Sequence, residues 1–300
     1  MAAFVCGDVL DKTVPDKTLD ETLIVASWNL REFGESKSSG RELEPLVYIA
    51  EVMSRMDLIA VQEVRRDLTA LDGLIRILGG WWKYVVSDVT AGRAGNNERV
   101  AFIYDSRKLS FGGLAGELTP EAKKKGKLLV AEEAFSRSPF LAGFRAGWFK
   151  SAICSVHTYY GTSSADVPQR AKDSDLAARL LKNRMKQKDR WANNAILLGD
   201  FNVFKVGDKT FQGLERADFQ IPAGLLGQYT NVNKDKPFDQ MGFVAPDVSR
   251  QLEVTKTGVF PFFDHVYRME DRSEYLPQET DAKYKQWRTY KMSDHMPIWC

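Results

Sequence analysis

Four short groups of polar residues in this chain could do chemistry, and each one follows a run of apolar, largely β-branched residues. They are Trp28-Asn29, Gln62-Glu63, Gly199-Asp200-Phe201-Asn202 and Ser293-Asp294-His295-Met296-Pro297. Carboxylates supply oxygen ligands for a hard cation, an imidazole can take a proton from water, and carboxamides can donate to phosphoryl oxygens. The combination predicts a metal-dependent site that hydrolyses a phosphodiester.

The elements that must position these groups alternate between strand and helix along the chain. Short runs rich in Val, Ile and aromatic residues predict strands at Leu23–Ser27, Leu58–Val61, Tyr84–Ser87, Val100–Tyr104, Ala152–Val156 and Ala195–Leu198. Apolar residues at helical spacing predict helices over Glu42–Arg55, Leu68–Leu78 and Ser174–Trp191. Residues 112–137 and 268–291 are polar without clear periodicity, which indicates surface loops. We expect a polar, partly helical lead-in over residues 1–21 and a single domain over residues 22–300.

Composition limits the class of protein. The 300 residues, 44% of them hydrophobic, are enough to bury a large core. A net charge of +2 is too small for binding a polyanion through bulk electrostatics, so any such binding must be local. No run approaches the roughly 18 apolar residues of a membrane span, and the start lacks the basic region of a secretory signal. The three cysteines, Cys6, Cys154 and Cys300, lie far apart, which indicates reduced thiols in a cytoplasm.

The order and local sequence of the polar groups resemble the endonuclease/exonuclease/phosphatase superfamily, and within it deoxyribonuclease I, from about Leu23 to Pro297. The segments that carry the resemblance are Asn29–Lys37, Gln62–Arg65, Glu98-Arg99 before an apolar strand, and Phe135–Pro139, which is similar to a phosphate-contacting segment. The resemblance implies an α/β (α+β) fold, a four-layer αββα sandwich of two mainly antiparallel sheets flanked by helices. It also implies that loops at one edge of the sandwich carry the site.

The resemblance further implies where a divalent cation binds. Glu63 corresponds to the principal metal ligand, Asp294 to a second carboxylate near the metal, and Asn29 to a supporting oxygen. A cation held by one or two carboxylates, water and a substrate phosphate suits Mg²⁺, and Mn²⁺ fits similarly. On the residues alone, Glu63 is equally well the polar end of a strand and Asp294 a turn or cap residue.

Two histidine–carboxylate pairs are implied as well. His295 corresponds to the base that takes a proton from the attacking water, and His157, oriented by Glu98, to the partner on the leaving-group side. Two acids compete as the partner of His295, because Asp239 and Asp264 both follow aromatic residues and precede apolar ones. The resemblance favours Asp239.

The remaining implied site residues contact the substrate. Asp200 orients the water or the phosphate, and Asn202 donates a hydrogen bond to a phosphate oxygen. Arg31, Arg65 and Arg137 correspond to phosphate-facing arginines, and a guanidinium suits bidentate phosphate contact. Without the resemblance, the Gly-Asp-Phe-Asn group is also compatible with a simple turn, and an exposed arginine with a solvated charge.

Some positions depart from the deoxyribonuclease I pattern. Asn96 stands two residues before Glu98, where deoxyribonuclease I has a minor-groove tyrosine, so docking into a duplex minor groove is not implied. The basic runs Lys123–Lys125 and Lys182–Arg190 either extend a phosphate track or form a solvated face. The sequence ends at Cys300, three residues after the Pro of the last motif, where family members generally extend further, so we expect either a fragment or an atypical terminus, and in that case a weakly stabilised last strand.

These observations predict a cytoplasmic, bacterial, divalent-metal-dependent nuclease that binds nucleic acid and hydrolyses DNA phosphodiesters, without a membrane partner. By family analogy the products carry 5′-phosphate and 3′-hydroxyl ends. An alternative within the superfamily is a phosphomonoesterase or lipid phosphodiesterase, of the inositol-phosphate phosphatase or sphingomyelinase type. No segment matches the Pro-x-Trp-x-Asp-Arg motif usual in the inositol phosphatases. The third hypothesis, an inactive scaffold for protein binding, is disfavoured because every implied catalytic position has a competent side chain.

Overall fold

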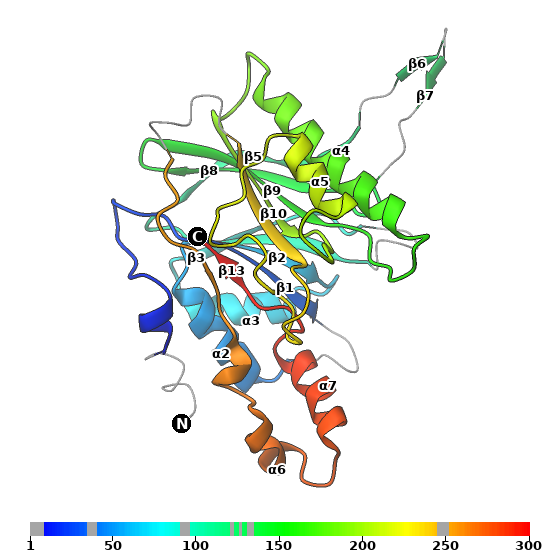
Figure 1. Cartoon of the computed structure of the whole chain (residues 1–300). Helices are drawn as coiled ribbons and strands as arrows, with labels where there is room; N and C mark the ends of the chain where they lie inside the picture. The colour runs from blue at the N-terminus through cyan, green and yellow to red at the C-terminus, as the bar shows by residue number, and fades with distance from the viewer. Residues whose placement is uncertain are drawn as a thin grey trace.

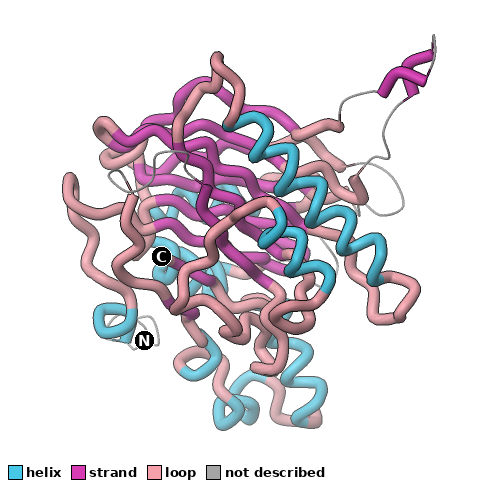
Figure 2. The backbone as a smooth tube through the Cα atoms, turned by 45° about the horizontal axis from the view of Figure 1, so that its top comes forward, coloured by secondary structure: helices cyan, strands magenta, loops and turns pink. Residues whose placement is uncertain are grey.

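The computed structural model describes residues 9–34, 41–90, 97–120, 123–125, 128–130, 135–244 and 252–300. In this part of the chain, two β-sheets pack face to face, and helices cover the outer face of each sheet (Figure 1). Figure 2 shows the strands enclosed between the two helical layers. The predicted αββα sandwich is therefore confirmed.

The first sheet has six strands in the order β12-β13-β1-β2-β4-β3. Their bounds are Gly258–Val259, Ile298–Trp299, Val25–Phe33, Leu58–Val64, Arg99–Asp105 and Trp82–Val86. Only β1 and β2 pair in parallel, and the other neighbours are antiparallel. Helices α2 (Leu43–Ser54) and α3 (Thr69–Leu78) bury their apolar residues against the outer face of this sheet.

The second sheet has five strands in the order β11-β10-β9-β8-β5. Their bounds are Asp239–Val244, Asn194–Asp200, Phe149–His157, Phe140–Ala146 and Ser110–Glu117. Again one pair, β9 with β10, is parallel and the rest are antiparallel. Helices α4 (Val167–Met185) and α5 (Lys209–Arg216) cover its outer face, and the Asp208 carboxylate caps α5 by accepting from the Phe211 amide at 2.8 Å.

The central strands are apolar on both faces because each one lies between two hydrophobic layers. In β2, Leu58 and Ala60 pack between the sheets, whereas Ile59 and Val61 pack under the helices. Strand β10 alternates in the same way. A strand buried on both faces appears in the sequence as an unbroken apolar run. This burial explains why the central strands could be predicted.

The six predicted strands correspond to β1, β2, β3, β4, β9 and β10, and the three predicted helices to α2, α3 and α4. Some bounds differ. Helix α4 begins at Val167 rather than Ser174 and ends at Met185 rather than Trp191, and a proline in its first turn marks its start. Strand β1 continues to Phe33, so Asn29 lies within the strand rather than after it.

Both predicted surface loops were wrong in part. Residues 112–137 contain most of β5 and a hairpin of β6 (Lys123–Lys125) and β7 (Leu128–Val130). Residues 268–291 contain a 3-10 turn, η3 (Met269–Asp271), and the helices α6 (Arg272–Tyr275) and α7 (Asp281–Lys291), which follow another 3-10 turn, η2 (Phe262–Asp264). Helix α7 buries Tyr284 and Thr289 instead of aliphatic residues, so its sequence lacks the usual apolar periodicity.

Residues 9–13 of the predicted lead-in are helical, and Leu10 and Val14 belong to the hydrophobic core beneath the first sheet. The separation of the lead-in from the domain stays a prediction. Cys6 lies outside the described residues, and Cys154 and Cys300 are free thiols. Within the described ranges, none of the helices combines the length and the apolar character that a membrane span requires.

Candidate active site

The predicted site residues come together at one edge of the sandwich. Strands β1, β2, β9 and β10 end at this edge, and β4 and β11 begin there (Figure 1). Asp200 and His157, at the ends of β10 and β9, are direct cross-strand neighbours. Asp239, the first residue of β11, is the neighbour of Asp200 on its other side. The topology therefore places residues far apart in sequence side by side.

Irregular backbone aims the side chains of the first sheet into this edge. Arg31, Glu32 and Glu63 have positive φ angles of 35°, 50° and 60°, and the pairing of β1 and β2 shifts register between Asn29 and Phe33. Left-handed residues other than glycine are uncommon, and such bulges redirect side chains. Here the Asn29 side-chain oxygen accepts from the Arg31 amide at 2.9 Å, and the Glu63 carboxylate accepts from the Glu32 amide at 2.8 Å.

Gly199 allows the second sheet to close at the same edge. Its φ is 132°, and a Cβ at this position would lie 2.1 Å from the carbonyl oxygen of Val156. Only glycine lets β10 approach β9 this closely just before Asp200 and His157. The glycine of the Gly-Asp-Phe-Asn group is thus a packing requirement of the site.

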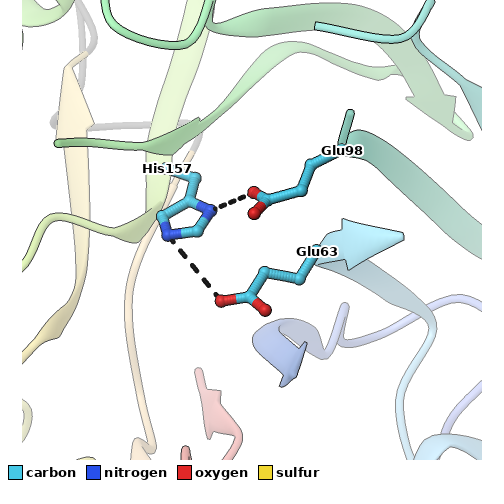
Figure 3. A group of neighbouring side chains, drawn as sticks. All are labelled: Glu63, Glu98 and His157. Carbon is cyan, nitrogen blue, oxygen red and sulfur yellow. Dashed lines mark hydrogen bonds and ion pairs between the residues drawn. The ribbon is translucent and has the colours of Figure 1, made fainter. Parts of the chain in front are cut away.

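The first histidine–carboxylate pair lies between the two sheets (Figure 3). His157 Nδ1 is 2.8 Å from Glu98 Oε2, and His157 Nε2 is 3.9 Å from Glu63 Oε1. Glu98 also lies 3.2 Å from the guanidinium of Arg137. Burial and the charge of Arg137 lower the pKa of the His157 imidazole, but the Glu98 and Asp200 carboxylates together raise it, and the net pKa lies above the ordinary value.

The second pair is His295 with Asp239. His295 Nδ1 is 2.8 Å from Asp239 Oδ2, and the imidazole stacks on Phe238 with the ring centroids 5.5 Å apart. Burial lowers the pKa of His295, whereas the Asp239 and Asp200 carboxylates raise it, and the net pKa lies well above the ordinary value. The competing acid, Asp264, is exposed and lies 3.0 Å from Lys234 instead. The structure therefore brings Asp239 to His295 and leaves Asp264 outside the site.

Asp200 lies between the two histidines. Its Oδ2 is 3.5 Å from His157 Nε2 and 3.7 Å from His295 Nε2, and it accepts from the Asn29 side-chain amide at 3.1 Å. Its Oδ1 accepts from the backbone amide of Asn202 at 2.9 Å. The Nε2 atoms of His157 and His295 thus both face the buried carboxylate of Asp200. These are the ring nitrogens that are not bonded to Glu98 or Asp239. A group that reacts there can exchange protons with either imidazole.

The oxygen donors next to these pairs fit a hard divalent cation. Glu63 and Asp294 have side chains 18% and 40% exposed, so both can share a cation with water. Two groups of three residues have ligand atoms within 4.8 Å of one another, namely Glu63, Glu98, His157 and Asp200, Asp239, His295. In each group the histidine Nδ1 is already bonded to a carboxylate, which leaves Glu63 in the first group and Asp200 in the second as the acids outside a histidine pair. Glu63 belongs to the first group and Asp294 to neither, so the ligand set of Glu63, Asp294 and Asn29 stays a prediction.

Asn29 contacts this group differently from the prediction. Its amide nitrogen donates to Glu63 Oε1 at 2.9 Å and to Asp200 at 3.1 Å, while its oxygen accepts from the Arg31 amide. In this arrangement Asn29 orients two carboxylates. Its role as an oxygen ligand stays a prediction.

Arg31 and Arg65, two of the predicted phosphate-facing arginines, lie at the rim in ion pairs. Arg31 is 3.3 Å from Asp294, donates to the Thr289 hydroxyl at 2.5 Å, and its guanidinium lies 4.0 Å from the centroid of the Tyr290 ring. Arg65 is 3.2 Å from the carboxylate of Glu32. Their contacts with α7 and with acidic residues could not be predicted from sequence.

Arg137 and Asn202 meet on the other side of the site. Both donate to the carbonyl oxygen of Thr158, at 3.0 Å and 3.1 Å. The Arg137 side chain is nearly buried and also contacts Glu98. The predicted roles of all three arginines and of Asn202 in phosphate binding remain predictions. Asn96 and residues 35–37, which figured in the resemblance, lie outside the described residues.

Several residues that support the site carried no predicted role. Gln62 donates to the Ser155 hydroxyl at 2.8 Å and so links the two sheets below the site. The Ser293 hydroxyl donates to the Asn29 carbonyl at 2.6 Å, which joins the segment of Asp294 to β1. Gln62 and Ser293 belong to the polar groups that the sequence places after apolar runs. This position is the sequence feature that could have indicated their supporting role. Arg41 also contacts this region, and no sequence pattern pointed to it.

The fold and the site together define the class of protein. A mannosyl-6-phosphatase of Bacteroides thetaiotaomicron VPI-5482 has a similar structure, with a TM-score of 0.60 and 19% identity, covering 93% of this chain and 98% of that one. An endonuclease/exonuclease/phosphatase family protein from Bacteroides thetaiotaomicron matches with a TM-score of 0.56 and 19% identity, over 92% of this chain and 96% of that one. At these identities the likeness shows the fold, which is that of the endonuclease/exonuclease/phosphatase proteins.

Sequence similarity narrows the class. The chain is 30% identical over 190 residues to deoxyribonuclease-1 of Canis lupus familiaris, a region that covers 60% of this chain and 60% of that relative. The chain thus spans about 60% of the length of the relative it matches. No family model matches the chain. The resemblance to deoxyribonuclease I that the sequence motifs indicated is confirmed.

Proposed function

We propose that this protein is a divalent-metal-dependent nuclease that hydrolyses DNA phosphodiester bonds. The observation that carries the proposal is the convergence of His157 Nε2 and His295 Nε2 on Asp200, at 3.5 Å and 3.7 Å, with each Nδ1 bonded to a carboxylate. A phosphodiester held there would have one imidazole near the attacking water and the other near the leaving oxygen. Similarity to deoxyribonuclease-1 over 60% of the chain supports the same reaction.

Glu63 and Asp294 would hold the cation, which we propose to be Mg²⁺ or Mn²⁺. When bound, the cation would polarise the scissile phosphate and offset the carboxylate charge around both histidines. Asn29 keeps the Glu63 carboxylate in place through its amide nitrogen, at 2.9 Å. The partial exposure of both acids leaves room for water and for a phosphate oxygen.

The proton transfers follow from the two pairs. His295 takes a proton from the attacking water, while Asp239 fixes the imidazole tautomer and stabilises the imidazolium that forms. His157, held by Glu98, supplies a proton to the leaving oxygen. Asp200 lies between them and orients the water or the phosphate.

Charge on the phosphate is met by donors around the site. Asn202 would donate to a phosphoryl oxygen, and Arg31, Arg65 and Arg137 would contact phosphates of the nucleic acid. All three arginines already lie in ion pairs with acidic residues, so the substrate would share them. We further propose that the substrate is DNA and that the protein is located in the cytoplasm. Both proposals are based on the sequence.

A plasmid-nicking assay tests the proposal. The protein is incubated with supercoiled plasmid in Mg²⁺, in Mn²⁺ and in EDTA, together with the variants His295→Ala and His265→Ala. His265 is the matched control, because it is the one histidine of the chain to which the proposal gives no role, and its ring stacks on Phe260. We expect metal-dependent nicking by the wild type and by His265→Ala, and loss of nicking in His295→Ala.

Two results would contradict the proposal. Equal nicking by His295→Ala would remove His295 from the reaction. A folded wild type that never nicks DNA or RNA would exclude a nuclease, and hydrolysis of a sugar phosphate or p-nitrophenyl phosphate by that protein would then support the phosphomonoesterase alternative. The mannosyl-6-phosphatase of the same fold makes a hexose 6-phosphate a suitable probe.

A further inference from the structure

Arg41 lies just before α2, outside every motif of the sequence, yet its guanidinium reaches the edge of the active site. Its Nη2 donates to the carbonyl oxygens of Leu30, of Arg31 at 3.1 Å and of Met292 at 2.7 Å. The guanidinium also lies 5.2 Å from the centroid of the Phe33 ring. One side chain thus joins the end of β1 to the C-terminal end of α7.

The two joined segments are those that carry the proposed cation ligands. Leu30 and Arg31 directly follow Asn29, whose amide holds Glu63 at 2.9 Å. Met292 lies two residues before Asp294. No strand pairing joins Asn29–Phe33 directly to residues 292–294, since β1 pairs with β13 only at Ala26 and Ser27 among the described residues. The spacing of Glu63 and Asp294 therefore depends on side-chain ties such as that of Arg41.

The backbone that Arg41 holds is strained. Arg31 and Glu32 have consecutive positive φ angles, and the amide of Glu32 donates to Glu63 at 2.8 Å. Non-glycine residues in this conformation cost energy and persist only where the surroundings fix them. Hydrogen bonds from Arg41 to the carbonyls of Leu30 and Arg31 fix this stretch and thereby the carboxylate of Glu63.

The positive charge of Arg41 affects the affinity for a divalent cation in the opposite direction to its hydrogen bonds. Burial lowers the pKa of its guanidinium to about 10, so the group is still a cation at neutral pH, and Glu63 and Asp294 are both close enough to stabilise its charge. A fixed cation near two carboxylates repels a divalent cation. Charge alone therefore predicts that removing Arg41 tightens cation binding, whereas geometry predicts that it weakens cation binding.

We propose that Arg41 is a positioning residue, which holds the β1 end and the segment of Asp294 at the spacing that binds a divalent cation, and that this effect exceeds the charge repulsion. The inference rests on the proposed function only in placing the cation at Glu63 and Asp294. The Ser293 hydroxyl and the Arg31–Thr289 contact tie the same segments, at 2.6 Å and 2.5 Å, so the loss of Arg41 should be partial. Removal of residues that orient metal ligands typically weakens affinity about 10- to 100-fold.

Direct measurement of Mn²⁺ binding without substrate tests the proposal. Free Mn²⁺ is followed by electron paramagnetic resonance during titration of the wild type, Arg41→Lys, Arg41→Met and Arg288→Met. Arg41→Lys keeps the charge but lacks the planar fork that reaches several carbonyls, so it isolates geometry. Arg288 is a matched control, because its guanidinium is also desolvated, lies 4.2 Å from the centroid of a phenylalanine ring, and donates to a backbone carbonyl at 3.0 Å, but ties no ligand segment.

We expect Mn²⁺ affinity to fall about tenfold or more in Arg41→Lys and Arg41→Met, and to stay at the wild-type value in Arg288→Met even where its melting temperature falls. The Mn²⁺ concentration for half-maximal turnover should rise in parallel in the Arg41 variants, with kcat recovering at saturating Mn²⁺. Unchanged or tighter binding in either Arg41 variant would overturn the inference while leaving the proposed function intact. A wild type that binds no Mn²⁺ would overturn the cation site itself, and the inference with it.

Discussion

The two histidine–carboxylate pairs have the same contact geometry but different electrostatic surroundings. In each pair the imidazole Nδ1 lies 2.8 Å from its carboxylate. Glu98, however, also lies 3.2 Å from Arg137, whereas Asp239 has no arginine or lysine within ion-pair distance among the described residues. The positive charge of Arg137 lowers the pKa of His157, whereas the Asp294 carboxylate adds to the groups that raise the pKa of His295, and the pKa of His295 is raised further above its ordinary value. Equal distances therefore do not mean equal proton affinity.

This difference bears on which imidazole acts as the base. A base must be neutral before the reaction, and the histidine with the lower pKa loses its proton more readily. The protein charges alone thus favour His157 as the base, while the resemblance to deoxyribonuclease I assigns that role to His295. A cation beside Glu63 would be close to His157, whose Nε2 is 3.9 Å from Glu63, and would lower the pKa of His157 further.

The largest effect is expected from removing an imidazole. Changing His295 to Ala should lower kcat about 10³-fold, because acid–base catalysis by a positioned side chain contributes roughly 10² to 10⁴. His157→Ala should lower kcat to a similar extent, and the double variant should be little worse than either single one, since both act in one transition state. Single-turnover nicking rates at saturating Mg²⁺, with circular dichroism as the control for folding, measure this. Fully multiplicative losses would show that the two histidines contribute independently rather than as one unit.

A smaller and unequal effect is expected from removing the carboxylates. Without Asp239, the His295 ring keeps Asp200 at 3.7 Å, whereas without Glu98 the His157 ring keeps both Asp200 at 3.5 Å and Glu63 at 3.9 Å. Asp239→Asn should therefore lower kcat by about 10²-fold, at the lower end of the roughly 10² to 10⁴ that a positioned acid or base contributes, and Glu98→Gln by about 10-fold, because the imidazole itself remains. The ratio of the two rates under identical metal concentrations is the measurement. A greater loss in Glu98→Gln would reverse the ranking of the pairs.

The pairs also show how far the sequence could be interpreted. The central strands were predictable because burial on both faces makes them apolar runs, and the polar groups that follow these runs could be assigned to one edge. Asp239 could be preferred over Asp264 only through the resemblance, because both follow aromatic residues. Strand β5 was missed because it is largely exposed and contains glycines, and α7 because it buries few apolar residues.

Tertiary contacts explain the rest of what was missed. The positive φ angles of Arg31 and Glu63 depend on pairing between strands, which no local pattern encodes. Arg137 was predicted to face phosphate, but its contact with Glu98 links residues almost forty positions apart and changes the proton affinity of His157. Arg41 carries no motif because its acceptors are backbone carbonyls. Side chains that bind backbone leave little trace in a single sequence.

Removal of Arg137 sharpens the comparison through the pH dependence of turnover. Arg137 lowers the pKa of His157, so Arg137→Met should raise that pKa toward that of His295. If His157 must be neutral, as a base, the acidic limb of the kcat profile moves to higher pH. If His157 must be protonated, as an acid, the alkaline limb moves to higher pH instead. The profile is measured between pH 5 and 10 with Arg145→Met as the control, since Arg145 is exposed on β8 and lies outside the site. A profile with neither limb moved would mean that Arg137 does not set the proton affinity of His157.

The smallest effect concerns folding rather than turnover. A histidine whose pKa is higher in the folded than in the unfolded protein contributes stability that is complete below about pH 6.5 and is lost as pH rises through the folded pKa. Both site histidines have this sign, and His295 is raised more. In EDTA, His295→Gln should therefore lower the unfolding free energy more at pH 6 than at pH 9. His157→Gln should show the same trend, but the change in its effect between pH 6 and pH 9 should be smaller. Urea denaturation at the two pH values measures both. If the loss in unfolding free energy depended equally on pH in both variants, Arg137 would not make the proton affinities of the two histidines different. Their shared contact geometry would then set both affinities.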